Sequence, residues 1–148
     1  MMNERFKKFV ENDFALEIYH ENSSRGVKTG QKEKLIFRSR QNKVKGLLKF
    51  IKKYGKRFKN LTVFDTRVGN AAALLIVYIG AREAFAKIGS ISARKTFKKF
   101  KIKYHFLQTI PHILNKKGDG LCPLEKLSFS KTPEEFLESA QIFLKMKV

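Results

Sequence analysis

Hydrophobic and polar residues repeat with two different periods along this chain, and each change of period marks a predicted element. Residues 14–19 alternate every second position, as half-buried strands do, and we expect them to pair as a hairpin with the apolar run at residues 35–37. Residues 44–54 instead place apolar side chains every three or four positions between lysines. This spacing predicts an amphipathic helix that ends at Gly55.

The least polar part of the sequence lies between residues 61 and 80. Residues 61–64 are mostly β-branched or aromatic, which predicts a buried strand. Residues 67–79 contain the longest apolar run of the chain, residues 71–79, which predicts a central buried helix closed by Gly80. We expect Asp65 or Thr66 to cap this helix by accepting hydrogen bonds from its first amides. A strand would therefore end where a helix begins.

A second strand-to-helix turn follows. Residues 84–88 form a short predicted strand, Ser90 is placed to cap a helix over residues 91–100, and the alternation of residues 102–106 with lysines is typical of an exposed edge strand. When two such turns lie beside each other, their helix N-termini form a crevice where open α/β sheets usually bind ligands.

Two helices close the chain. Pro123 favours a short helix over residues 121–127, and the run Thr132-Pro133-Glu134-Glu135 is a capping box that begins the last helix. The order of elements predicts the α/β class, with a mixed sheet covered by helices. We expect a helical extension at residues 1–12 and a single domain at residues 13–148.

The composition adds limits to this picture. The chain has 148 residues and one cysteine, so it has no internal disulfide and no multi-cysteine metal cage. Its longest apolar run, residues 71–79, is far shorter than the roughly 20 residues that cross a bilayer, and its first residues lack the apolar segment of a signal peptide. We therefore expect a soluble cytoplasmic protein that does not enter membranes.

The net charge is the unusual property: the chain has 32 basic and 13 acidic residues, which gives a net charge of +19. Two stretches, residues 38–59 and 94–117, contain no acidic residue. They indicate either a composition bias on solvated helix faces or a surface for non-specific nucleic-acid binding. The basic residues of such a surface would be Lys43, Lys45, Lys49, Lys52, Lys53, Lys56, Arg57, Arg94, Lys95, Lys98 and Lys99.

Three stretches together carry a resemblance to a known family, namely residues 65–73, residues 84–88 and the run Gly118-Asp119-Gly120-Leu121-Cys122-Pro123-Leu124-Glu125-Lys126. The chain resembles the uncharacterised prokaryotic family DUF1893, assigned to the cytidine deaminase-like fold, from Asp13 to Leu144. The resemblance implies a three-layer α/β/α sandwich with a mixed sheet and a single deaminase-like domain, but no reaction. The sequence departs from the family at Asn70, where a basic residue is common, and in a longer, more basic loop at residues 20–32.

Zinc-dependent deamination is the activity that the sequence argues against. Deaminases place zinc-binding His or Cys residues at the starts of two successive helices. The corresponding segments here, residues 67–71 and 89–93, contain neither residue type. Cys122 and the scattered histidines have no recognisable zinc spacing, so no metal and no other cofactor is predicted.

We therefore expect a small anionic or nucleotide-like ligand at the two turns, with residues 119–125 as a wall or lid. The candidate ligand-binding residues are Asp65, Thr66, Arg67, Gly69, Asn70, Gly89, Ser90, Ser92, Asp119, Cys122 and Glu125. Two alternatives stay open: a basic nucleic-acid-binding module, and a metal-independent enzyme that uses Asp65 or Cys122 as its catalytic residue. The sequence does not identify the ligand, and it is compatible with a homo-oligomer.

Overall fold

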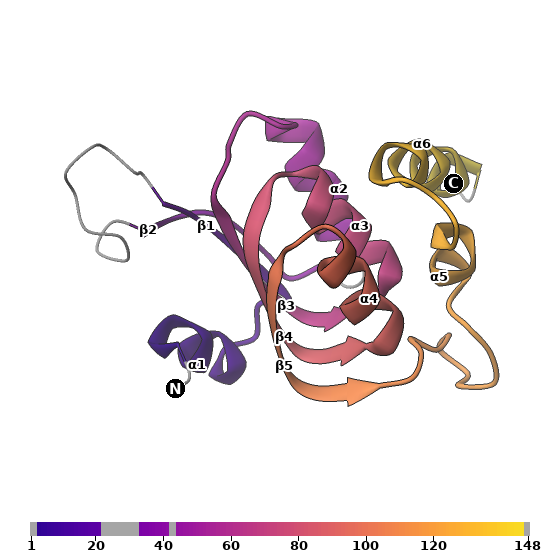
Figure 1. Cartoon of the computed structure of the whole chain (residues 1–148), viewed down its shortest axis with the longest axis horizontal. Helices are drawn as coiled ribbons and strands as arrows, with labels where there is room; N and C mark the ends of the chain where they lie inside the picture. The colour runs from indigo at the N-terminus through magenta and orange to yellow at the C-terminus, as the bar shows by residue number, and fades with distance from the viewer. Residues whose placement is uncertain (1–2, 22–32, 42–43, 147–148) are drawn as a thin grey trace.

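A five-stranded mixed sheet forms the centre of the computed structural model, which describes residues 3–21, 33–41 and 44–146 (Figure 1). The strand order is β2-β1-β3-β4-β5; β1 runs antiparallel to β2 and β3, and the β3–β4 and β4–β5 pairs are parallel. The strands are β1 (Leu16–Glu21), β2 (Glu33–Ser39), β3 (Leu61–Val68), β4 (Ala81–Ser90) and β5 (Lys103–Ile110). The predicted hairpin is confirmed. Most of the predicted loop at 20–32 lies outside the described residues.

The central strands are longer than predicted. β3 continues to Val68 because its residues pair on both sides, Asp65 with Leu16 of β1 and Val68 with Gly89 of β4. The prediction that Asp65 or Thr66 caps the next helix is therefore wrong, since ladder hydrogen bonds keep both residues extended. β4 is likewise longer than the predicted 84–88. The prediction of β5 as an exposed edge strand is confirmed.

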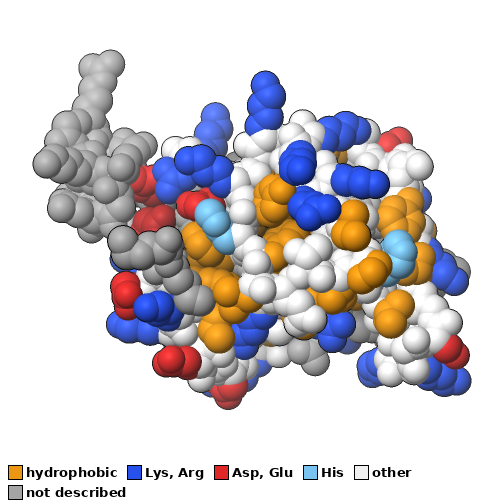
Figure 2. Space-filling model, turned by 60° about the horizontal axis from the view of Figure 1, so that its bottom comes forward, with side chains coloured by type: hydrophobic (Ala, Val, Ile, Leu, Met, Phe, Trp, Pro, Cys, Tyr) orange, Lys and Arg blue, Asp and Glu red, His pale blue; other side chains and the backbone are white. Residues whose placement is uncertain are grey.

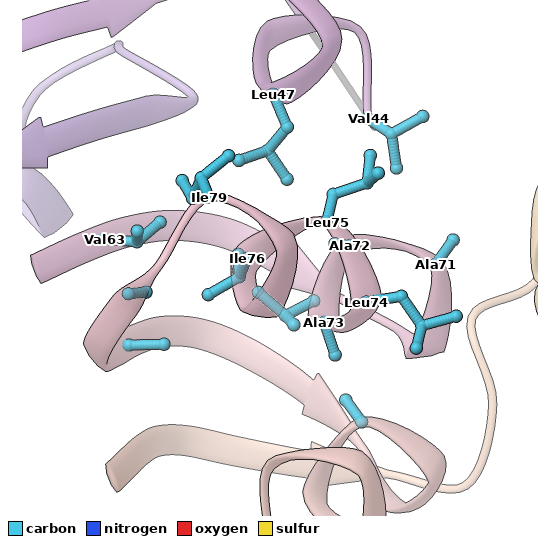
Figure 3. Packing of buried hydrophobic residues seen from close by; sticks show 14 of the residues in the cluster. Val44, Leu47, Val63, Ala71, Ala72, Ala73, Leu74, Leu75, Ile76 and Ile79 are labelled. Carbon is cyan, nitrogen blue, oxygen red and sulfur yellow. The ribbon is translucent and has the colours of Figure 1, made fainter. Parts of the chain in front are cut away.

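Five helices lie on one side of the sheet, three of them against it and the last two of the chain against the central helix. They are α2 (Lys45–Tyr54), α3 (Asn70–Tyr78), α4 (Ile91–Lys99), α5 (Pro123–Ser128) and α6 (Pro133–Met146). The apolar α3 is buried from Asn70 to Ile76, as predicted for a central helix, although it begins later than residue 67. Figure 3 shows Leu75 of α3 directed toward Val44 and Leu47 of the α2 region.

Several helices begin or end at the residues that the sequence predicted. Gly55 and Gly80 follow α2 and α3 with φ of +57° and +86°, a conformation that glycine adopts without strain. Before α6, the capping box is formed: Glu135 N donates to Thr132 Oγ1 and Thr132 N donates to Glu135 Oε1. The short helix α5 begins at Pro123 rather than at residue 121.

The opposite face of the sheet carries α1 (Glu4–Glu11) (Figure 1). Phe6 and Phe9 of this helix are buried against Phe64 and Phe85 of the central strands. The predicted N-terminal helix is therefore present, and it packs on the sheet. The architecture is an α/β fold with helices on both faces of a mixed sheet. Within the described ranges, no helix is long and apolar enough to cross a membrane.

Candidate functional site

A cavity of about 540 Å³ lies at the carboxyl end of β3. Its walls come from the end of β3, the first turn of α3 and the segment 113–125. Among the predicted ligand residues, those that line the cavity are Asp65, Thr66, Arg67, Gly69, Cys122 and Glu125. The predicted wall at residues 119–125 is thus partly present, through Cys122 and Glu125.

Asp65 is the chemically unusual residue of this cavity. Its side chain is 95% buried in the sheet, because the residue exposes only 5% of its surface. Its Oδ1 accepts a 2.7 Å hydrogen bond from the backbone N of Thr66, whereas its Oδ2 has no partner among the described residues. Burial raises the pKa of Asp65 to about 8, although the nearby backbone amides of Thr66 and Arg67 oppose the shift. The carboxyl group is therefore mostly protonated at neutral pH.

Glu125 is the second buried carboxyl group, and it is bound to the start of α3. Its Oε2 accepts a hydrogen bond from Asn70 N at 3.0 Å and its Oε1 accepts one from Ala71 N at 2.7 Å. Burial raises the pKa of Glu125, while these two amides and the charge of His112 oppose the shift. The helix N-terminus that the sequence offered to an anionic ligand is thus occupied by a carboxyl group of the chain itself.

Gly69 is placed beside this carboxyl group. A Cβ atom at residue 69 would lie 2.5 Å from Cδ and Oε1 of Glu125, which is far inside van der Waals contact. Gly69 precedes α3 as its N-cap residue with an extended backbone, so positive φ is not the reason for glycine here. The group that lies closest to Gly69 in this structure is the Glu125 side chain, and glycine leaves room for it.

Asn70 is turned away from the cavity. Its Nδ2 donates to Ser128 Oγ at 2.9 Å, and its Oδ1 accepts a short hydrogen bond from Thr96 Oγ1. The side chain therefore ties α3 to α4 and α5.

The second predicted turn contributes nothing to the lining of the cavity. Ser90 caps α4, because its Oγ accepts a 3.0 Å hydrogen bond from Ala93 N, and this prediction is confirmed. Ser92 Oγ lies 2.9 Å from Ser90 Oγ. Gly89 lies under the ring of Phe106, where a Cβ atom would come within 2.2 Å of the ring. Structural roles account for the positions of these three residues.

The segment before α5 places one predicted residue in the cavity wall and one outside it. Cys122 is buried and lines the cavity at the start of α5. Asp119 is exposed and accepts a 2.9 Å hydrogen bond from Asn115 Nδ2 in a turn. Asn115 and Lys116 line the cavity, and sequence reasoning missed both. No pattern marks them, because only the docking of α5 against α3 brings their loop to the end of β3.

The basic residues predicted for nucleic-acid binding lie on two helices. Lys45, Lys49, Lys52 and Lys53 are exposed on α2, followed by Lys56 and Arg57. On α4, Lys95, Lys98 and Lys99 are exposed and Arg94 is half-buried. Lys43 lies outside the described residues.

In a deaminase-like fold, the starts of α3 and α4 would be the positions that bind zinc. The first residues of α3 and α4 include no His or Cys, so neither helix start supplies a zinc ligand of the deaminase type. In the described part of the chain, no group of three or more His, Cys, Asp or Glu side chains is arranged to hold a metal ion. The residues present therefore do not fit a deaminase zinc centre.

The fold and this site can be set beside known proteins. The profile of a family described as a domain of unknown function, DUF1893, matches residues 15–144. A solved structure of a DUF1893 family protein (TM1506) from Thermotoga maritima is similar, with a TM-score of 0.74 and 26% sequence identity over 95% of this chain and 91% of that chain. No curated protein matches. Because the family profile covers most of its length, the chain belongs to the DUF1893 family.

Proposed function

We propose that the cavity at the end of β3 binds a small nucleotide-like molecule, with an uncharged hydrogen-bonding ring inside and an anionic group at the mouth. The observation that carries this proposal is the Oδ2 atom of Asp65, which has no partner in the described part of the chain. A buried polar atom without a partner costs roughly 1–3 kcal/mol, and native proteins keep few of them. A ligand that pairs with Oδ2 removes this cost.

The chemistry of Asp65 defines the buried end of the ligand. With a pKa of about 8, the group is mostly a neutral carboxylic acid at pH 7, so it donates one hydrogen bond and accepts another. A ring nitrogen beside an amino or carbonyl group presents the complementary pair of atoms. The surrounding side chains of Val44, Ala72, Ile113 and Leu124 are apolar and suit the faces of a planar ring.

The mouth of the cavity favours negative charge. Arg67 and Lys116 both line the cavity and are both exposed, so they lie at its rim. Neither forms an ion pair with a carboxylate of the described residues. Since Glu125 occupies the amides of α3, we assign the anionic group of the ligand to these two side chains rather than to the helix N-terminus.

We further propose that the domain is a deaminase-like α/β/α sandwich that has lost its metal. The placement of the cavity supports this proposal, because it lies where a parallel strand is followed by a helix, at the carboxyl edge of the sheet. A crystal structure superposed on a zinc-containing deaminase would test it. The proposal requires the start of α3 to coincide with the deaminase zinc position.

One observation favours a metal-independent enzyme as the second candidate. Asp65 and Cys122 line the same cavity, and a carboxyl group with a pKa of about 8 exchanges protons readily near neutral pH. The test is to incubate a bound ligand with the protein and with Asp65→Asn and to follow both its mass and its proton NMR spectrum, since an isomerisation leaves the mass unchanged. Conversion that depends on Asp65 would support an enzyme, and a ligand unchanged by both measurements would leave only binding.

The main experiment has two stages. Native mass spectrometry of the purified protein identifies any small molecule that co-purifies, and thermal shifts with nucleosides and nucleoside monophosphates extend the search. The Asp65→Asn and Arg67→Ala variants are then compared with Glu83→Gln as the control, because Glu83 pairs with His105 on another strand and does not line this cavity.

We expect a nucleoside monophosphate to stabilise the wild type and Glu83→Gln more than either cavity variant. Arg67→Ala should weaken the monophosphate more than the matching nucleoside. If no tested molecule binds, or if both cavity variants bind as tightly as the wild type, the proposal is wrong.

A further inference from the structure

The basic residues of this protein differ in whether they have partners. On the side of the sheet that carries α1, Arg5, Arg38 and Arg82 each pair with a glutamate that is largely buried. Their charges are balanced within the fold. Such residues are poor candidates for binding a polyanion, because the polyanion would have to displace a carboxylate that is already in place.

The residues around α4 form the contrasting group, which we call the α4 surface. It consists of Arg94, Lys95, Lys98, Lys99 and Lys101. Within the described ranges, none of the five lies within ion-pairing distance of a carboxylate. No acidic residue occurs anywhere between residues 91 and 117. This surface therefore keeps an uncompensated positive field, which a polyanion would neutralise.

Aromatic side chains lie beside these cations. Tyr104 and Phe106 on β5 are half-buried, and their rings pack against the fully buried Phe97 of α4. Phe100 at the end of α4 is also half-buried, with Lys99 Nζ 5.5 Å from its ring centroid. On the face shown in Figure 2, Lys and Arg side chains lie directly next to apolar ones.

We propose that the α4 surface binds single-stranded nucleic acid, with its lysines on the phosphates and the half-buried aromatic rings against unstacked bases. Cations beside accessible rings are the combination that proteins use for single strands without sequence preference. A duplex fits less well, because its bases are stacked on one another and present only their edges. This function is separate from ligand binding at the cavity of Asp65.

The basic face of α2 is the natural rival, and it provides a matched control. Lys49, Lys52 and Lys53 are exposed and have the same spacing along α2 as Lys95, Lys98 and Lys99 along α4. In both triples the last two lysines lie in the final turn of the helix. We favour α4 because Glu134 of α6 already pairs with Lys56 just beyond α2.

The experiment measures fluorescence anisotropy of a labelled oligothymidylate of about 20 nucleotides and of a duplex of the same length at salt concentrations from about 50 to 200 mM. The α4 triple Lys95→Gln/Lys98→Gln/Lys99→Gln is compared with the α2 triple Lys49→Gln/Lys52→Gln/Lys53→Gln. Both triples remove the same charge. Circular dichroism checks that both remain folded.

We expect the α4 triple to lose at least about tenfold in affinity for the single strand and to reduce the slope of log K against log salt by about 2, whereas the α2 triple changes affinity less than about threefold. Tyr104→Leu, which keeps apolar packing but removes the ring, should cost about fivefold or more without changing the salt slope.

Three results would overturn the proposal. Equal losses in the two triples would show that only net charge matters. Duplex binding as tight as single-strand binding would remove the role of the rings. An unchanged affinity in a folded Tyr104→Leu protein would do the same.

Discussion

Two buried carboxyl groups line one cavity, and their surroundings differ. Glu125, which is 3% exposed, has both oxygens bound by backbone amides at the start of α3. Asp65, which is 5% exposed, has one oxygen bound by the amide of its neighbour and one that finds no partner among the residues the structure describes. Burial raises the pKa of both groups. The cost of burying a carboxyl group is therefore offset at Glu125 by hydrogen bonds to both oxygens, whereas at Asp65 the fold supplies a hydrogen bond to only one oxygen.

This difference separates the two walls of the cavity by role. The Glu125 wall is built for stability, because its carboxyl group joins α5 to α3 and excludes a side chain at residue 69. The Asp65 wall retains an unsatisfied group, which is typical of functional sites.

The largest effect should be a pH dependence of stability that Asp65 causes. A carboxyl group whose pKa is raised from 3.8 to about 8 on folding binds its proton more tightly in the folded protein. Its penalty is absent below about pH 4, and the free energy of unfolding falls as pH rises toward 8, by up to about 1.4 kcal/mol per pH unit. Urea unfolding of the wild type and of Asp65→Asn between pH 4 and pH 8 measures this pH dependence of the free energy of unfolding.

The comparison with Asp65→Asn is needed because the pKa of Glu125 is also raised. The two stability curves should diverge with rising pH, with the Asn variant the more stable at pH 8. Parallel curves would show that Asp65 has an ordinary pKa.

Removing the Glu125 carboxyl group should be the next largest effect. Glu125→Ala leaves the amides of Asn70 and Ala71 without acceptors in a buried place and loosens α5, so we expect a loss of about 3 kcal/mol in the free energy of unfolding. Glu125→Gln keeps one acceptor and should lose less. Denaturant unfolding at one pH compares them, and an equal, small loss in both variants would contradict a capping role.

A methyl group at residue 69 should cost about 2 kcal/mol, because it would overlap the Glu125 carboxyl group. The double variant with Glu125→Ala sharpens this test. In that background Gly69→Ala should cost much less, which gives a coupling energy between the two positions. Additive effects would mean that Gly69 is required for some other reason, such as ligand approach.

The smallest effect should come from the local cap of α4. Ser90→Ala removes one acceptor for Ala93 N and should cost about 1 kcal/mol in thermal unfolding. Since Ser90 does not line the cavity, the variant should keep any ligand that the wild type binds. Loss of ligand in this variant would show that the turn at residues 89–92 contributes to ligand binding after all.

The site was predictable where it depends on local signals. Residues 65–70 and 89–92 were predicted to form one site with residues 119–125 as its wall or lid, and the six candidates that line the cavity come only from the first and the last of these segments. The capping role predicted for Asp65 was wrong, because a polar residue between a strand and an apolar helix has the local pattern of a cap. Asn115 and Lys116 were missed, because a turn-forming loop carries no signal for the surface on which it lies.

The sequence alone determined which segments are strands and helices and which faces are buried. The apolar α3, the α2 stripe, the Ser90 cap and the Thr132 capping box follow from side-chain period and local hydrogen bonding, which act within a few residues. Tertiary structure decided where α3 begins and what binds its first amides. Pairing with β1 and β4 keeps Asp65 extended, and Glu125 reaches the helix start from 55 residues away. Contacts at that separation depend on how the elements pack, which no local pattern specifies.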